Sequence, residues 1–506
     1  MLRNKSFLQV MAASSMLNVT RLAINTIAWL ILVPVILNLL GEELFGIWTL
    51  VTSALAVAGV LDLGMSASAT KFMSEFKAAG KSQEMSEALS IALTIQLLFG
   101  ILGGGLLFVL APNMPAAFGV APENISATIW SFRIAAIGLP LSILRAFTAT
   151  LPTVVLRYDV SNALMLGFTI TTAVATVLVA TYSQSVESVL LATVLTIFGF
   201  TLLGVVACRS IFPDIHIHIV SNRETWKRML GFSGHATLAS IAGRIFMYAD
   251  KIIVGMVLGP AAAGYYSIAV GFGAKINQVG AAIANALLPA FSALQGADAD
   301  REKLARLFMQ VHISYSTIIF YLGSIAFVLS VPFFEMWLSK TATQDIKLLL
   351  QAAIIAYTLF SLSATSYFVV YALNLPQFNS GLISLGSILS LTLIYIFSKF
   401  FGLAGAGFGN LGYVVVLGLM IVVFKHLKIR FIDYLVTVWQ PMLLFVVAMA
   451  IEKIWPADSL FWAGIYSVGI SMLFGPILYK QLKVKKYLTN WRSTRKGMFL
   501  KSSGTL

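Results

Sequence analysis

The sequence predicts an all-α integral membrane protein with 14 transmembrane helices, and three observations support this fold class. The 506-residue chain is 59% hydrophobic and only 11% charged, whereas soluble domains carry about 25% charged residues. Apolar runs close to the roughly 20 residues that cross a bilayer recur along the chain. Basic residues fall mainly in alternate loops between these runs. Together these features exclude a soluble multidomain enzyme.

Glycine, proline and charge clusters bound the predicted spans. The first span follows a short basic start (Arg3 and Lys5) and is too long for the apolar region of a cleaved signal peptide, so we expect it to cross the membrane with the N-terminus inside. The loops are too short for a soluble catalytic domain. In order, the predicted spans are residues 15–40, 45–70, 87–110, 125–150, 160–181, 188–208, 230–257, 262–292, 308–331, 346–372, 379–398, 404–424, 433–451 and 460–480.

The charge distribution supports this topology. The formal net charge is +14, from 34 Lys and Arg against 20 Asp and Glu. Of the 34 basic residues, 24 fall in segments predicted inside, four in segments predicted outside and six within spans. This asymmetry matches the positive-inside rule, so we expect no nucleic-acid partner. The single cysteine, Cys208, excludes an intramolecular disulfide, and we place His216 and His218 in a solvated loop or short strand rather than a metal site.

One internal repeat predicts the organisation of the spans. LGEELFGIWTL (40–50) recurs as LGPAAAGYYSI (258–268), with Gly46 and Gly264 at equivalent positions. The repeat predicts two six-helix lobes related by an axis along the membrane normal, with a substrate path between them; a recurring tight turn is the alternative. The predicted domains are an N-lobe (1–208), a cytoplasmic loop (209–229), a C-lobe (230–424), helices 13 and 14 (425–480) and a basic tail (481–506).

Eight charged residues are predicted within the spans and away from their first and last two residues. A charge at the centre of a membrane helix costs about 2.5–3.5 kcal/mol or more, so these side chains should face a wet cavity or one another. Their sum is positive, which favours an anionic ligand such as a phosphate or pyrophosphate group. The bases are Arg21, Arg133, Arg145, Arg244, Lys251 and Lys275, and the acids are Asp62 and Asp250.

Depth and helical periodicity suggest roles for these residues. Arg21 shares a helix face with Asn25 and lies at a depth that would allow an ion pair with Asp62. Asp250 should point about 100° away from Lys251, towards a neighbouring helix or a cation; a structural pair with Arg244 or Lys251 is the alternative. We predict substrate binding by Arg21, Asn25, Arg133, Arg244, Lys275 and Gln278, ion coupling or gating by Asp62, Asp250 and Lys251, and cavity lining or snorkelling by Arg145.

The sequence indicates no catalytic residue, metal site or cofactor other than a coupling ion, Na⁺ or H⁺. The GAGFG run at 405–409 superficially matches a dinucleotide fingerprint. It opens a membrane helix with no preceding strand, so it indicates close helix packing through small residues instead.

Three stretches resemble the polysaccharide-transport proteins, the Wzx-type oligosaccharide flippases of the multidrug/oligosaccharidyl-lipid/polysaccharide (MOP) exporter superfamily. They are LGEELFGIWTLVTSALAVAGVLDLGMSASATKFMSEF (40–76), ADKIIVGMVLGPAAAGYYSIAVGFGAKINQVGAAIANALLPAFSAL (249–294) and FGLAGAGFGN (401–410). The resemblance implies two six-helix lobes and a terminal helix pair, as in MATE-like folds, working by alternating access. It places Arg21 and Lys275 in a cationic cavity, and Asp62 and Asp250 at charged positions of the second and seventh helices.

The resemblance also implies a substrate and a location. The substrate would be an undecaprenyl-pyrophosphate-linked oligosaccharide, moved from the cytoplasmic to the periplasmic leaflet of the bacterial inner membrane for O-antigen, capsule or exopolysaccharide synthesis, with both termini cytoplasmic. Further partners would be anionic lipids and the polysaccharide polymerase machinery. The alternatives are a multidrug or organic-cation antiporter of the same superfamily, a membrane-embedded polymerase or ligase, and a scaffold for a glycan-assembly complex. Six bases argue against the antiporter, and short outer loops argue against the enzyme.

Overall fold

The computed structural model describes residues 7–218, 220, 222–285, 291, 301–338, 340–373, 375–457 and 459–482. Within these residues the chain is all helical and contains no strand, which confirms the predicted all-α fold. The α-helices are α1 (Phe7–Leu40), α2 (Glu42–Ala58), α3 (Met65–Ala78), α4 (Ser82–Leu110), α5 (Met114–Phe118), α6 (Ile125–Thr150), α7 (Tyr158–Ser183), α8 (Val186–Ile211), α9 (Arg223–Leu258), α10 (Pro260–Asn285), α12 (Arg301–Trp337), α13 (Lys340–Ser361), α14 (Ala364–Ala372), α15 (Pro376–Gly409), α16 (Gly418–Leu427), α17 (Phe431–Ile454) and α18 (Leu460–Leu482).

Five short 3₁₀ helices extend or connect these elements. They are η1 (Gly59–Asp62), η2 (Ala111–Asn113), η3 (Pro122–Asn124), η4 (Leu151–Val155) and η5 (Asn410–Leu417). The first of them follows α2 and marks a break within the second predicted span.

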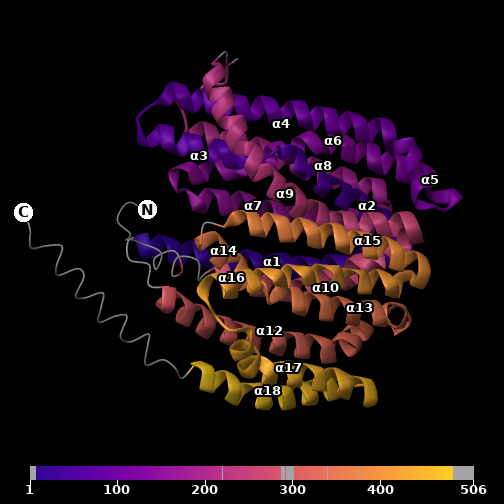
Figure 1. The fold of residues 1–506 in the computed structure, drawn as a ribbon. Coiled ribbons are helices and arrows are strands. Elements are labelled where there is room, and N and C mark those ends of the chain that lie inside the picture. The colour runs from indigo at the N-terminus through magenta and orange to yellow at the C-terminus, as the bar shows by residue number, and fades with distance from the viewer. Residues whose placement is uncertain are drawn as a thin grey trace, which may run out of the picture. The chain divides into compact units, whose positions relative to one another are not determined.

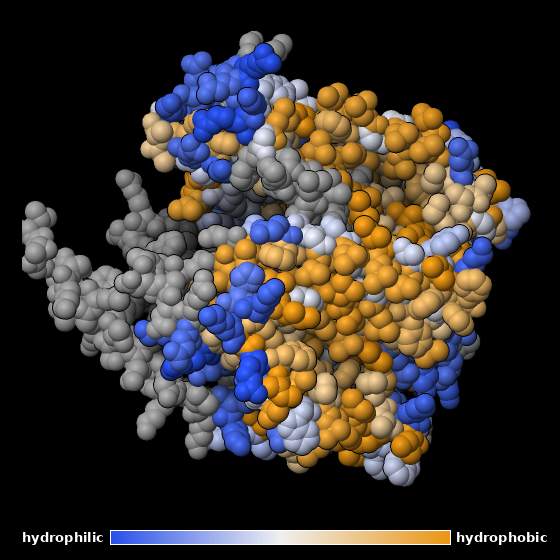
Figure 2. All heavy atoms as spheres, viewed as in Figure 1, coloured by the Kyte–Doolittle hydropathy of each residue, from blue (hydrophilic) through white to orange (hydrophobic). Residues whose placement is uncertain are grey.

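Eleven helical segments in the described residues are long and apolar enough to cross a membrane. The longest of them, Pro376–Leu427, covers two predicted spans, and α9 and α10 cover two more. Each of the predicted spans thus overlaps a described helix, while the count of 14 crossings stays a prediction. The exposed helix surface is rich in large apolar side chains, and Figure 2 shows a broad apolar area with hydrophilic groups gathered near its edges, as expected for a surface in contact with lipid.

The chain divides into two compact units. The first contains residues 1–275, 348–353 and 379–415, and the second contains residues 276–347, 354–378 and 416–506. In the first unit α4, α6 and α8 lie side by side, and in the second α12 packs against α17 and α18 (Figure 1). These units do not follow the predicted lobe boundaries, which stay a prediction.

The repeated turns have the same backbone geometry and pack against each other in the first unit. Gly41, between α1 and α2, has φ 80° and ψ 173°, and Gly259, between α9 and α10, has φ 90° and ψ 172°. Such positive φ values favour glycine because it lacks a Cβ atom. A Cβ atom on Gly46 would lie 2.0 Å from the backbone oxygen of Pro260, and one on Gly264 would lie 2.7 Å from Phe45. The second glycines of the repeat thus allow the two turns to touch, while the two-lobe arrangement inferred from the repeat stays a prediction.

This contact makes Gly46 sensitive to substitution. Replacing Gly46 by alanine should lower the free energy of unfolding by about 1–3 kcal/mol, because the obstructing atoms belong to the backbone and cannot rotate away. The thermal unfolding midpoint of the purified protein measures this effect. Gly105→Ala is the matched control, since its Cβ atom would meet nothing within 4 Å. Equal midpoints for the two variants would show that the turns do not pack as described.

The helix labelled α15 consists of two antiparallel segments. Gly402 has a non-helical backbone with φ 62° and ψ −147°. After this kink, Gly405, Gly409 and Gly412 lie against Phe397, Ile394 and Ser390 respectively, so the chain runs back along itself. The two segments match the separate spans predicted at 379–398 and 404–424. Close approach through glycine also confirms the small-residue packing predicted for the GAGFG run.

The loop that follows α8 spans residues 212–222 and is shorter than predicted, because α8 continues to Ile211 and α9 begins at Arg223. The backbone N–H groups of His216 and His218 donate to Ser86 and Ser90 of α4. Asn222 caps α9 by accepting from the N–H groups of Glu224 and Thr225. The predicted loop position of the two histidines is confirmed.

The second unit has a polar and aromatic core around α12. His312 is fully buried and stacked between Phe308 and Tyr434, with ring centroids 5.0 and 4.9 Å away. Its Nδ1 atom lies 2.6 Å from the Thr365 hydroxyl of α14. Hydrogen bonds from Thr317 to Gln481 and between Tyr321 and Ser471 join α12 to α18. These contacts connect the terminal helices to the rest of this unit.

Candidate functional site

One face of α1 carries the first group of predicted site residues. Arg21, Asn25 and Trp29 follow each other at intervals of four residues, so they lie on the same side of the helix. Arg21 is half-buried and Nη1 lies 3.1 Å from the sulfur of Met165 in α7, while Asn25 is exposed. Arg21 and Trp29 are about 12 Å apart along the axis, from a rise of 1.5 Å per residue.

Lys275 of α10 joins this face at the end that carries Trp29. Its Nζ atom lies 5.4 Å from the centre of the Trp29 ring, a cation–π contact. One helical turn earlier, a Cβ atom on Gly271 would lie 3.2 Å from the indole. A side chain there would require the indole to shift by a few tenths of an ångström, so glycine lets α10 approach Trp29 closely. The aromatic ring thereby holds Lys275 beside the face that carries Arg21.

Neither Arg21 nor Lys275 is paired with a carboxylate among the residues that the structure describes. The sequence allowed an Arg21–Asp62 ion pair, and the structure does not form it: Asp62 contacts Ser66 and Gln96 instead. The interruption after α2 redirects the carboxylate towards α4. Two bases therefore lie near one helix face, and no carboxylate in the described chain neutralises their charge.

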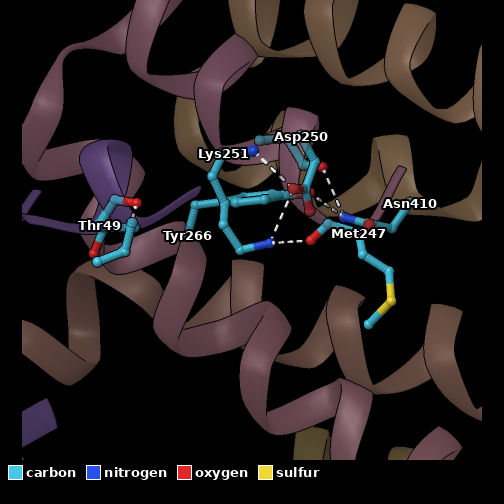
Figure 3. Close-up of polar contacts among 8 residues, drawn as sticks. Thr49, Met247, Asp250, Lys251, Tyr266 and Asn410 are labelled. Carbon is cyan, nitrogen blue, oxygen red and sulfur yellow. Dashed lines mark hydrogen bonds and ion pairs between the residues drawn. The ribbon is translucent and has the colours of Figure 1, made fainter. Parts of the chain in front are cut away.

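The acidic residue of α9, Asp250, lies in a buried ion pair. Only 1% of Asp250 is exposed, and its Oδ1 atom lies 2.9 Å from Nζ of Lys251, which also donates to the backbone oxygen of Met247. The tyrosine hydroxyl of Tyr266 interacts with this carboxylate and accepts a hydrogen bond from Asn410. Figure 3 shows these groups converging from three segments of the first unit.

This arrangement shows the partners of Asp250: its carboxylate reaches Tyr266 of the neighbouring helix α10 as well as Lys251. Successive Cβ atoms on a helix point about 100° apart, but the long lysine side chain curls back over the carboxylate. Of the alternatives left open, the structural pair with Lys251 is the one that forms. Asp250 consequently has a cation of its own within the protein.

Asp62 has a different environment. It ends η1, and its Oδ1 atom accepts hydrogen bonds from the Ser66 hydroxyl at 2.6 Å, from Nε2 of Gln96 at 2.6 Å and from the Ser66 N–H at 3.3 Å. No ion pair in the described part of the chain includes Asp62. Its partners are neutral donors only.

Arg133 and Arg145, both in α6, lie against aromatic rings. The guanidinium of Arg133 sits 5.2 Å from the rings of both Phe108 and Trp130, which are 41% and 53% exposed. Arg145 lies 3.8 Å from the Phe168 ring. In both arginines Nε is buried and has no hydrogen-bond partner among the described residues. Aromatic faces attract a guanidinium and shield it from hydrocarbon, so each of these arginines has an aromatic partner.

Two further predicted residues add little to this site. The side chain of Arg244 lies outside the described side chains, although its backbone belongs to α9. Gln278 is half-buried and follows Lys275 by three residues in α10. No group of three or more potential metal ligands occurs in the described chain.

Sequence reasoning missed several participating residues. Trp29 and Met165 are ordinary residues of apolar spans, and no pattern distinguishes them from lipid-facing positions. Tyr266 lies in the repeated turn, and Asn410 ends a glycine-rich run. Gln96 could have been recognised from the sequence, because a glutamine inside an apolar helix needs a polar partner.

Comparisons with known proteins agree with this architecture. A protein family described as "Polysaccharide biosynthesis protein" matches residues 35–344 of this chain. A putative O-antigen transporter of Shigella flexneri is 24% identical over 261 residues, which cover 50% of this chain and 60% of that protein. The lipid II flippase MurJ, in an inward closed conformation, superposes with a TM-score of 0.73 at 13% identity, covering 93% of this chain and 99% of MurJ. An inward-facing multidrug resistance MATE family transporter of the MOP superfamily gives a TM-score of 0.63 at 14% identity, covering 83% and 98%.

The fold and the charged groups within its spans define a multi-pass helical membrane protein built like the flippases and transporters of the MOP superfamily. The chain belongs to the polysaccharide biosynthesis protein family, whose match covers more than half of its length. This confirms the family resemblance and the MATE-like fold class. The relatives are named as transporters or flippases and not as enzymes.

Proposed function

We propose that the protein is a flippase that moves an undecaprenyl-pyrophosphate-linked oligosaccharide from the cytoplasmic to the periplasmic leaflet by alternating access. The observation that carries this proposal is the pair Arg21 and Lys275, two bases within the spans that have no carboxylate partner in the described chain. An unneutralised base inside a membrane is costly unless it meets an anion or water. The phosphates of a lipid-linked glycan supply that anion.

The residues of the α1 face and Lys275 would bind different groups of the substrate. Guanidinium and ammonium groups form strong charge-assisted hydrogen bonds with phosphate oxygens, and these gain strength away from bulk water. Arg21 and Lys275 would hold the diphosphate, while the exposed amide of Asn25 between them can donate to a phosphate or sugar oxygen. The polyprenyl chain stays in the lipid, so only the polar headgroup has to pass through the protein.

The proposal also states a cellular setting. The family match and the O-antigen transporter relative support a role in the synthesis of O-antigen, capsule or exopolysaccharide. We place the protein in the bacterial inner membrane with both termini cytoplasmic, because the basic loops and tail then follow the positive-inside rule. The polymerase that consumes the flipped repeat unit and anionic lipids near the basic tail are its proposed partners.

Reconstitution tests this function directly. The purified full-length protein is placed in liposomes with a lipid-linked oligosaccharide, and leaflet transfer is followed by access of a sugar-modifying reagent to the outer leaflet. We expect transfer well above that of protein-free liposomes. Transfer at the protein-free rate, together with uptake of an organic cation by the same vesicles, would identify an antiporter and overturn the proposal. Absence of both activities would favour a scaffold.

A further inference from the structure

The two acids of the spans differ in how their charge is balanced. Asp250 is paired with Lys251, whose Nζ atom lies 2.9 Å away. Asp62 receives only neutral donors and enters no ion pair in the described residues. An exchangeable cation can neutralise Asp62 but would have to displace a bonded lysine at Asp250. The carboxylate open to an external cation is therefore Asp62.

The helical backbone is interrupted next to Asp62. Broken helices of this kind hold cation sites in membrane transporters. After α2 and η1 the chain takes positive φ values of 48° at Leu63 and 68° at Gly64, and α3 then begins at Met65. A helix end leaves carbonyl groups without intrahelical donors. Unwound carbonyls of broken membrane helices coordinate small cations in transporters. The break thus places Asp62 where the helix is interrupted, between η1 and α3.

Gln96 of α4 also contacts Asp62, and one of its amide atoms lacks a partner. Its side chain is 0% exposed, and Nε2 donates to Asp62 Oδ1 at 2.6 Å and to the Ser66 hydroxyl at 3.1 Å. The other amide atom, Oε1, is buried and has no hydrogen-bond partner in the described part of the protein. A buried carbonyl oxygen normally has a partner. A half-turn of the amide would exchange Nε2 for Oε1, so Gln96 can serve the carboxylate as a donor or a cation as a ligand.

We propose that Asp62, Ser66 and Gln96 form a binding site for a monovalent alkali cation at the break in the second spanning segment. The ligands are a carboxylate, a hydroxyl and an amide oxygen, all hard oxygen donors that suit a hard cation. A single carboxylate balances one positive charge, and no cluster of further acidic or histidine ligands in the described chain would favour a divalent ion. The role of this site in driving transport rests on the proposed function, whereas cation binding itself does not.

Thermal unfolding of the purified full-length protein tests the site. Midpoints are measured in NaCl or KCl and compared with choline chloride at equal ionic strength and constant pH, because a ligand that binds only the folded state stabilises it. The wild type should show a saturating rise of about 2–4 °C in at least one alkali salt. Asp62→Asn and Gln96→Leu should abolish this rise, and Ser66→Ala should shift its half-saturation to higher salt.

Controls separate the site from general salt effects. Asp214→Asn removes an exposed carboxylate of the loop after α8 and should keep the full rise. Equal midpoints in alkali and choline salts for the wild type, or an undiminished rise in both Asp62→Asn and Gln96→Leu, would overturn the site. If Asp62→Asn fails to fold, Gln96→Leu and Ser66→Ala decide the question.

The leaflet-transfer assay distinguishes this inference from the proposed function. A cation-dependent rise in a protein that transfers no lipid-linked oligosaccharide would uphold the site and reject the flippase. If the protein transfers lipid-linked oligosaccharide but alkali cations do not change its unfolding midpoint, the flippase function is upheld and the cation site is rejected.

Discussion

Replacing Lys275 by glutamine should lower the initial rate of lipid-linked oligosaccharide transfer by about 10- to 100-fold. A hydrogen bond to a charged group contributes about 1.5–3 kcal/mol, and every 1.4 kcal/mol is a factor of ten. Arg21→Gln should have an effect of the same size, because both bases meet the same headgroup. Lys275→Arg should retain most of the activity, since a guanidinium also binds phosphate and stacks on Trp29.

The control for this experiment is Lys453→Gln, which removes an exposed base near the end of α17. It should transfer at the wild-type rate. Membrane abundance is measured for each variant, so that loss of protein is not mistaken for loss of transfer. Wild-type rates for both Lys275→Gln and Arg21→Gln would show that the α1 face does not bind the substrate.

Lys251→Met should produce the largest loss of stability, about 3–5 kcal/mol. The substitution leaves the Asp250 carboxylate buried without its cation, and breaking a buried ion pair from one side costs about that much. The readouts are the thermal unfolding midpoint and the amount of protein in the membrane. The double variant Asp250→Asn, Lys251→Met should recover most of this loss, because it removes the uncompensated charge.

An exposed lysine provides the comparison. Lys399→Met, in α15, changes the same atoms at a surface position and should leave the midpoint nearly unchanged. A Lys251→Met protein as stable as Lys399→Met would mean that Asp250 does not depend on the adjacent ammonium group.

The helices were predictable because hydropathy and charge act along the whole length of each span. The kink at Gly402 illustrates this: the apolar runs on either side of it were correctly separated into two spans. The repeat also located two turns that share backbone angles at Gly41 and Gly259. The compact units were not predictable, since they depend on contacts between distant helices and not on any local pattern.

The site was predictable only in part. Depth and periodicity selected Arg21 and Lys275, but they do not show where a long side chain ends. The same limit explains why the sequence left the partner of Asp250 open, and why it allowed an Arg21–Asp62 pair that the structure does not form. Trp29 was not predicted, because the chain has nine tryptophans in a mostly apolar sequence. Composition cannot show which of them contacts a lysine.

The central claim, that unpaired bases receive a phosphorylated headgroup, is tested most directly by competition in the reconstituted system. Transfer of the lipid-linked oligosaccharide is measured with increasing amounts of a short-chain polyprenyl diphosphate or of the uncharged polyprenol of equal length. We predict that the diphosphate inhibits wild-type transfer while the alcohol does not, and that Lys275→Gln lowers the sensitivity of the residual transfer to the diphosphate. Equal inhibition by both compounds, or inhibition by neither, would contradict the claim.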